Sequence, residues 1–289
     1  MKNVALQYED IFSGDLILVN EEHPLSVQAE DISSCSRNLA QRTFTYSRNL
    51  PQGAAFFPQT QHHAPSFIAV DEEYPDILLQ KKAATVLSHM IQDIGGEKEI
   101  VPVSGYRSGE EQTRIWEESI KENGEEFTRK YVALPGHSEH QTGLAIDLGL
   151  KKEVIDFIRP DFPYEGICGR FRQIAPEYGF IERYERGKEP ITKIAHEPWH
   201  FRYVGYPHSK IMKEQGISLE EYIEMLKKFP MEEQHYFYEK ETGRQAEVFF
   251  VPLSKKKKAM LSIPEECLYQ ISGNNVDGCI VTIWRNEHA

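Results

Sequence analysis

Two short segments of the sequence carry residue types that could bind a metal ion. The first, SEHQTGLAID at 138–147, holds His140, a turn containing Gly143, and then alternating residues that end in Asp147. Alternate residues of a strand share a face, so Asp147 lies beside the small Ala145, where the turn can fold His140 back over it. This segment predicts two metal ligands, an imidazole from the turn and a carboxylate from the strand.

The second segment, EPWH at 197–200, supplies another carboxylate and another imidazole. Pro198 has no backbone N–H and disfavours a helix interior, so the segment differs from the helical HExxH motif of zinc proteases. We expect a loop that presents Glu197 and His200 to one cavity.

Together the two segments predict a catalytic zinc site. Three ligands, His140, Asp147 and His200, leave the fourth tetrahedral position for water, which is typical of catalytic rather than structural zinc. Glu197 would then lie beside the metal without binding it. That is the place of a general base, which takes a proton from the water and passes it to the leaving amine.

Arg107 is a candidate for the charge that develops during such a reaction. It follows a predicted strand at 100–104, in the turn GYRS at 105–108. A guanidinium held beside the metal can stabilise the oxyanion formed on the attacked carbonyl, and one such donor is typically worth ~2.7–4 kcal/mol. The alternative is a surface arginine that caps a turn.

The two segments and their surroundings resemble the D-alanyl-D-alanine metallopeptidases, which include VanX-type dipeptidases, VanY-type carboxypeptidases and two-function VanXY proteins. Residues 138–147 match the signature SxHxxGxAxD, and residues 197–200 match ExxH. The resemblance covers residues 14–228 and extends to GDLILVN near the start, SGYRS at 104–108 and YGFIERYERGKEPITKIAHEPWHFRYVG at 178–205.

This resemblance implies a hydrolase with one Zn²⁺ per chain and a defined set of site residues. The matching positions are His140, Asp147 and His200 for zinc, Glu197 for the base, and Arg107 for transition-state stabilisation. Ser138 and Gln112 match positions that contact the peptide and terminal carboxylate of the substrate. Alternatively, Gln112 is a solvated helix residue and Ser138 a turn former.

The implied substrate is D-Ala-D-Ala, or the C-terminal D-Ala of the peptidoglycan precursor pentapeptide, with a role in glycopeptide (vancomycin) resistance. Two alternatives stay open. A related L,D-carboxypeptidase that acts on peptidoglycan tetrapeptides uses the same metal site. The scaffold also resembles the zinc-bearing domain of Hedgehog signalling proteins, a non-catalytic binding module, although the intact Glu197 and Arg107 argue against that function.

Other residues that could do chemistry have simpler explanations. His137 could be a metal ligand together with His140 only if both lay on one helix. Gly136 before it and Gly143 after it disfavour a helix there. The pair His62-His63 has no acidic partner at ligand spacing. Cys168 has no adjacent base, and Trp199 is expected to pack under the metal site. The sequence holds no Walker loop, no GxGxxG and no GxSxG motif.

The elements that must position the site predict an α+β fold: a central antiparallel sheet with flanking helices and an open-face zinc site. Apolar spacing predicts helices at 74–94, within 164–184, where Gly179 is the C-terminal cap, and at 218–228. Another helix starts at the N-cap Ser108, with Glu111 as its capping-box partner. Strands are expected at 16–20, 100–104, 144–148, 191–195 and 201–204.

Two domains are expected. Residues 1–228 would form the zinc D,D-peptidase domain, with a lead-in segment at 1–60. Residues 229–289 would form a small β-rich C-terminal domain of unknown role, because short apolar runs alternate there with turn residues. These runs lie at 235–238, 246–251, 259–263, 268–272 and 279–284.

The amino-acid composition limits the classes of partner that the protein is expected to bind. The 289 residues carry a net charge of -12, which argues against nucleic acid despite the basic run Lys255–Lys258. The four cysteines lie far apart, as in reduced intracellular proteins, although a Cys267–Cys279 bridge is conceivable. No apolar run has the length of a signal peptide or a membrane span. We expect a cytoplasmic protein if the N-terminus is native, and an anchored or exported one if it was trimmed. The oligomeric state is not predicted.

Overall fold

A four-stranded antiparallel sheet forms the centre of the molecule. The computed structural model describes residues 1–25, 66–239, 244–256 and 258–286. The strands of the central sheet follow the order β4 (Ile100–Ser104), β5 (Ala145–Leu150), β7 (Glu197–Tyr203) and β6 (Phe180–Tyr184). All neighbouring strands are antiparallel. The predicted α+β fold with a central antiparallel sheet is confirmed.

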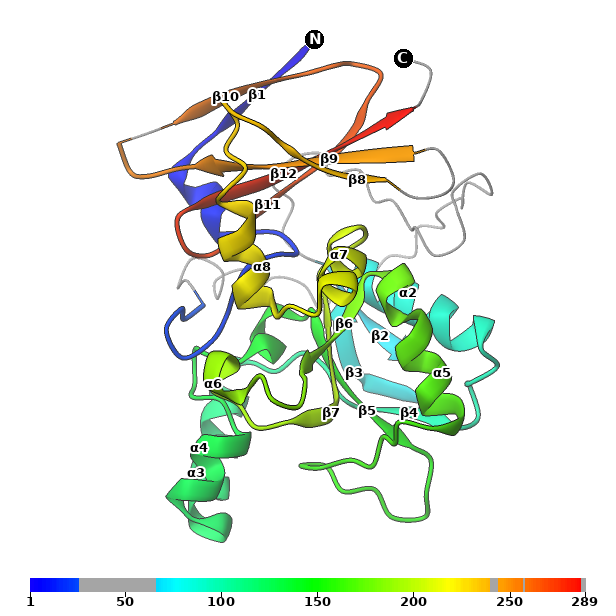
Figure 1. Cartoon of the computed structure of the whole chain (residues 1–289). Helices are drawn as coiled ribbons and strands as arrows, with labels where there is room; N and C mark the ends of the chain where they lie inside the picture. The colour runs from blue at the N-terminus through cyan, green and yellow to red at the C-terminus, as the bar shows by residue number, and fades with distance from the viewer. Residues whose placement is uncertain (26–65, 240–243, 257, 287–289) are drawn as a thin grey trace.

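One face of this sheet is apolar and packs against two helices, α2 (Lys81–Asp93) and α5 (Gly166–Ile174). Figure 1 shows the two helices side by side along the sheet. Alternation along the strands decides which side chains reach this core: Leu148 of β5 and Trp199 and Phe201 of β7 lie in it. Burying a large apolar side chain contributes about 1.5–3 kcal/mol. The alternate residues of these strands point to the opposite face. Asp147, between Ile146 and Leu148 of β5, is one of them.

The helix predicted at 74–94 starts later than expected. Residues Tyr74–Gln80 form strand β3, which pairs with β2 (Phe67–Asp71), and α2 begins only at Lys81. The prediction was wrong for the first seven residues because apolar residues 77, 78 and 79 fit either period. Pairing with β2, which lies close in space, decided between them.

Two predicted strands are absent from the described residues at the expected places. Residues 16–20 form no strand, and β1 (Lys2–Leu6) is the first one. The backbone at 16–18 instead bonds to the C-terminal part of the chain, through the Ser272 hydroxyl and the Asn274 carbonyl. The strand expected at 191–195 is also wrong, because the short helix α6 (Glu189–Thr192) lies there.

Local helix signals were more reliable. Helix α3 (Gly109–Asn123) starts after Ser108, whose hydroxyl accepts a hydrogen bond from the Glu111 N–H. It is followed by α4 (Glu125–Tyr131). Gly179 ends the helical turn η4 (Ala175–Tyr178) after α5, with the left-handed φ of 86° that favours glycine.

The C-terminal part of the chain contains all five predicted strands. Four form a sheet in the order β11 (Leu268–Gly273), β12 (Gly278–Asn286), β9 (Arg244–Pro252) and β8 (Tyr236–Glu239). The fifth strand, β10 (Ala259–Ile263), pairs with β1 at the N-terminal end of the chain. The helical turn η1 (Tyr8–Phe12) follows β1 in the sequence. In Figure 1 this part lies above the central sheet, with helix α8 (Leu219–Leu226) reaching down from it.

The two expected domains share a core. Helices α7 (His208–Gln215) and α8 (Leu219–Leu226) pack with Leu16 and Leu18 of the N-terminal segment and with Val248, Phe250 and Ile280 of the C-terminal sheet. Ser218 caps α8 together with Glu221 in a capping box. Pairing between strands β1 and β10 also connects the two parts. The division at residue 228 stays a prediction.

Three cysteines, Cys168, Cys267 and Cys279, are free thiols, so no Cys267–Cys279 bridge forms. Cys35, the pair His62-His63 and most of the lead-in segment lie outside the described residues. Within the described ranges, no helix has the length and apolar character needed to cross a membrane.

Candidate active site

Three side chains predicted as metal ligands converge on the face of the central sheet opposite helices α2 and α5. His140, Asp147 and His200 each offer one ligand atom, and these atoms lie within 4.8 Å of one another. Asp147 of β5 is the register partner of His200 on β7, and His140 comes from the turn η3 (Glu139–Thr142). Its Nε2 atom lies 3.2 Å from Asp147 Oδ2, and His200 Nδ1 lies 2.9 Å from Asp147 Oδ1.

The donor set fits a transition-metal ion. All three side chains are buried, and two imidazoles with one carboxylate suit zinc. The outer nitrogen of His140, Nδ1, lies 2.7 Å from the Gly105 carbonyl, which leaves Nε2 directed toward the cluster. A ligand histidine whose second nitrogen is held by a carbonyl or carboxylate is the usual arrangement at metal sites. The residues could therefore hold a metal ion.

Gly143 sets the geometry of the turn between two of these ligands. It has the left-handed φ of 67° and follows His140 by three residues. A Cβ atom at this position would overlap the ring of Phe67 on β2. Both the backbone conformation and the close approach of Phe67 therefore favour glycine.

Glu197 lies beside the cluster on strand β7, not on the predicted loop. Residues three apart on a regular strand point to opposite faces, but the β6–β7 register shifts between Glu182 and Tyr184, and Glu197 pairs with Tyr184. This irregularity brings Glu197 Oε2 to 3.8 Å from His200 Nδ1. Burial raises the pKa of Glu197 to about 8, and the negative charge of Asp147 adds to that shift.

Arg107 points into the same site. Its Nη2 donates to Asp147 Oδ2 at 3.1 Å and its Nε donates to the Ser104 hydroxyl at 2.8 Å. Gln112 is fully buried, and its amide nitrogen donates to the Ala133 carbonyl at 2.7 Å while its oxygen lies 3.5 Å from Arg107 Nη1. Neither residue is a solvated surface group. Ser138 is also buried, at the start of the turn that carries His140.

Sequence reasoning missed a buried ionic network behind the cluster. Glu139 Oε1 accepts hydrogen bonds from Arg183 Nε at 2.9 Å and Arg202 Nη1 at 2.8 Å, and its Oε2 lies 3.4 Å from His200 Nε2. Although burial opposes ionisation, the two guanidinium groups hold the pKa of Glu139 well below its usual range. Arg202 could have been found, because it follows His200 by two residues in a strand. Arg183 lies on β6, beyond the predicted helix end at Gly179, where no strand was predicted.

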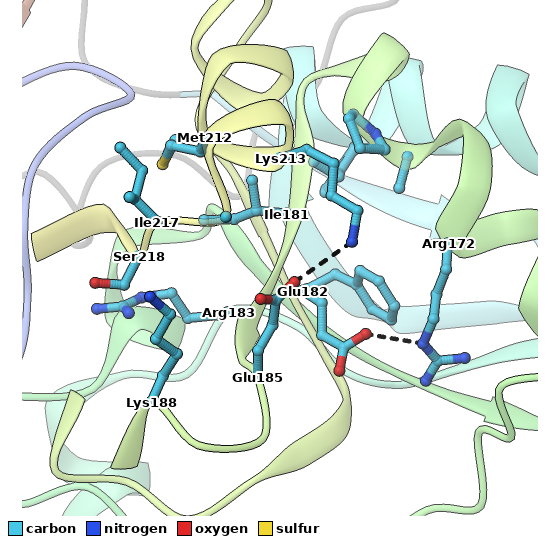
Figure 2. Close-up of a pocket in the computed structure, with 15 residues that line it drawn as sticks. Arg172, Ile181, Glu182, Arg183, Glu185, Lys188, Met212, Lys213, Ile217 and Ser218 are labelled. Carbon is cyan, nitrogen blue, oxygen red and sulfur yellow. Dashed lines mark hydrogen bonds and ion pairs between the residues drawn. The ribbon is translucent and has the colours of Figure 1, made fainter. Parts of the chain in front are cut away.

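A separate small cavity of about 70 Å³ lies along β6 and the segment between α7 and α8, and none of the three cluster residues lines it. Figure 2 shows Arg172 paired with Glu182 there, and Lys213 with Glu185. Two other cations of its lining, Arg183 and Lys188, pair with the carboxylates of Glu220 and Glu221, which lie outside the lining.

The other histidine candidate within the described residues, His137, lies apart from the cluster, and so does His196, a neighbour of Glu197 in the sequence. His137 Nδ1 contacts the Asn20 carbonyl at 2.8 Å, and His196 Nε2 lies 2.7 Å from the Tyr164 hydroxyl. Trp199 packs in the core on the other face of the sheet, as predicted.

The antiparallel sheet, the buried His–Asp–His cluster and the neighbouring carboxylate define a metallopeptidase. Residues 76–206 match the family model described as VanY, D-alanyl-D-alanine carboxypeptidase. A bifunctional D-Ala-D-Ala dipeptidase and carboxypeptidase, VanXYC of Enterococcus gallinarum, is 50% identical over 152 residues, which are 52% of this chain and 80% of that protein. The chain belongs to the D-alanyl-D-alanine metallopeptidase family.

Two further similarities extend over almost the whole chain. A D-alanyl-D-alanine carboxypeptidase of Enterococcus faecium is 33% identical across 96% of this chain and 77% of its own length. The solved structure of the vancomycin-resistance D,D-dipeptidase VanXYg, in complex with a D-Ala-D-Ala phosphinate analogue, has a TM-score of 0.82 and 49% identity. It covers 98% of this chain and 99% of that one. The likeness therefore includes the C-terminal β-strands.

Proposed function

We propose that this protein is a zinc-dependent D,D-peptidase that hydrolyses D-Ala-D-Ala and the C-terminal D-Ala of peptidoglycan precursor pentapeptide. The observation that carries the proposal is the convergence of His140, Asp147 and His200 within 4.8 Å, with Glu197 beside them. Similarity to VanXYC and to the VanXYg complex supports this substrate class and a role in glycopeptide resistance. The cytoplasmic location stays a prediction from the sequence.

In this proposal His140, Asp147 and His200 hold one Zn²⁺ per chain. When bound, zinc supplies a Lewis acid that polarises a carbonyl and makes a water molecule more acidic. The protein contributes a buried site, two imidazoles whose outer nitrogens face protein acceptors, and a carboxylate between them. These features keep the three donors in place.

Glu197 is the proposed general base. Its carboxylate accepts a proton from the attacking water and returns it to the nitrogen of the leaving D-alanine. Burial raises the pKa of Glu197 to about 8, while His200 and Arg107 act in the opposite direction. Positive charge at the ligand cluster favours the ionised form further, so Glu197 can exchange a proton near neutral pH.

Arg107 is proposed to stabilise the negative charge that develops on the carbonyl oxygen. Ser104 holds its Nε, and Gln112 lies beside its Nη1, so the guanidinium is already oriented toward the cluster. Ser138 and Gln112 are proposed to contact the peptide and its terminal carboxylate, on the basis of the family resemblance.

A substrate panel on the zinc-loaded protein tests the function. We expect release of D-alanine from the D-Ala-D-Ala dipeptide and from the pentapeptide. A protein that cleaves only the tetrapeptide would be an L,D-carboxypeptidase, and one that binds zinc but cleaves none of the three would fit a binding module. The relative rates on dipeptide and pentapeptide give the balance of the two D,D activities.

Substitution of the base tests the mechanism. We expect Glu197→Ala to retain one zinc per chain and to lower kcat by about 10²–10⁴-fold, the usual contribution of a general base. Zinc stoichiometry and D-alanine release measure the two effects. Glu185→Ala, which removes a carboxylate outside the cluster, is the control and should leave both unchanged. Retained turnover in Glu197→Ala would exclude Glu197 from this role.

A further inference from the structure

The network behind the cluster ends on the metal-ligand candidate His200. The ring of His200 has its two nitrogens on different sides: Nδ1 lies 2.9 Å from Asp147 Oδ1, inside the cluster, and Nε2 lies 3.4 Å from Glu139 Oε2, outside it. A neutral imidazole binds a metal through one nitrogen only if the proton is on the other. A carboxylate at Nε2 holds the proton there and fixes the plane of the ring.

Glu139 cannot move freely, because its other oxygen is shared by two buried guanidinium groups. Oε1 accepts from Arg183 and from Arg202, and all three side chains are 2% exposed or less. Arg202 in turn donates from Nη2 to the carbonyls of Asp15 and Ile17 in the N-terminal segment. The carboxylate that faces His200 is thus held from two directions.

Arg183 connects this carboxylate to helix α8. Its Nη1 and Nη2 donate to the two oxygens of Glu220 at 3.0 and 2.6 Å, and Asn20 donates to the same carboxylate at 3.2 Å. Arg183 and Ser218, the N-cap of that helix, line the same cavity (Figure 2). Glu220 and Asn20 lie outside residues 76–206, the part that matches the family model.

We propose that Glu139, Arg183 and Glu220 are positioning residues that orient His200 for metal binding and so connect helix α8 to the metal site. The proposal rests on the zinc site of the proposed function. Stability alone is a weak reason for such a network, because a buried ion pair replaced by apolar residues often costs nothing. The contacts run from Glu220 through Arg183 and Glu139 to Nε2 of His200, the nitrogen that faces away from the cluster. Because they end on a candidate ligand, they indicate a role in metal affinity.

Glu139→Gln tests the contact with His200. We expect the zinc dissociation constant, measured by competition with a chromogenic chelator, to rise about 10–100-fold, the usual effect of losing such a partner. Urea unfolding of the metal-free variant shows whether it is folded under the same conditions. A folded Glu139→Gln protein with an unchanged dissociation constant would overturn the proposal.

Glu220→Gln tests the outer end of the network without touching His200, and Glu221→Gln is its matched control. Both residues lie in the first turn of α8, but Glu221 pairs with Lys188 and with the Ser218 N–H. We expect weaker zinc binding in Glu220→Gln, by a smaller factor than in Glu139→Gln, and an unchanged dissociation constant in Glu221→Gln. Equal shifts in both variants would show an effect of helix stability and overturn the proposal.

If Glu139→Gln does not fold, Glu220→Gln and Glu221→Gln still test the positioning role. Zinc binding by the wild type separates a failure of the proposed function from a failure of this inference. A wild-type protein that binds no zinc contradicts the proposed function, and this inference with it. A wild-type protein that binds one zinc, with variants of unchanged affinity, contradicts this inference alone.

Discussion

Arg107 is proposed to serve two purposes in the site. It donates to Asp147, a ligand candidate, and this contact leaves the guanidinium at the cluster. The guanidinium carries further N–H groups, and in the proposed reaction these would donate to the oxyanion. Arginine suits both tasks because its planar fork donates several hydrogen bonds in fixed directions, whereas lysine offers a point charge.

Substitution of Arg107 is expected to slow the chemical step. We expect Arg107→Lys to lower kcat by about 10²–10³-fold, because one oxyanion donor is typically worth about 2.7–4 kcal/mol. Steady-state kinetics with D-Ala-D-Ala measure the effect. The control is Arg114→Ala, since Arg114 is an exposed residue of α3. A variant with normal kcat and only a raised KM would assign Arg107 to substrate binding alone.

At the scale of elements, the turn from η3 to β5 fixes the spacing of two ligands. Gly143 occupies the left-handed region, and the Phe67 ring, which packs against Tyr106 at 4.5 Å between centroids, covers it. The hairpin β2–β3 therefore has a role in the site, although none of its residues belongs to the cluster. It closes over the turn that carries His140.

Gly143→Ala is expected to destabilise the protein and weaken its metal binding. A left-handed conformation costs a non-glycine residue about 1–2 kcal/mol, and the overlap with Phe67 adds to that cost. Gly216→Ala is the matched control, because Gly216 has a similar φ of 63° and open space around it. Urea unfolding and zinc titration measure the two effects. Equal losses of stability, with unchanged zinc affinity, would exclude a role for the Phe67 contact.

At the scale of the whole molecule, a buried histidine joins three elements. His208 of α7 contacts the Tyr222 hydroxyl of α8 through Nδ1 at 2.7 Å, and Thr282 of β12 through Nε2 at 3.1 Å. Burial lowers the pKa of His208 to about 3. The neutral ring thus belongs to the folded state, while the unfolded chain binds a proton near pH 6.5.

Stability should therefore fall in acid through His208. The folded pKa is below the unfolded one, so the contribution is complete above about pH 6.5 and declines by up to about 1.4 kcal/mol per pH unit toward about pH 3. Urea unfolding of the wild type and of His208→Gln between pH 7 and 5 measures this. The wild type should lose more stability than the variant; parallel curves would contradict the assignment.

The sequence by itself determined the residue types of the site and much of the secondary structure near it. Alternation predicted the face of Asp147, and local signals predicted the cap at Ser108, the end at Gly179 and all five C-terminal strands. These features depend on neighbours within a few residues, which leave a periodic or compositional trace in the sequence. The roles of the site residues stay proposals.

Only the tertiary structure decided how those residues meet. The segment Tyr74–Gln80 became a strand because β2 was there to pair with it, and Glu197 reached His200 through a register shift against β6. Arg183 and Glu220, 37 positions apart, form an ion pair that no spacing rule indicates. Contacts of this kind depend on the packing of distant elements, so their energy has no local signature in the chain.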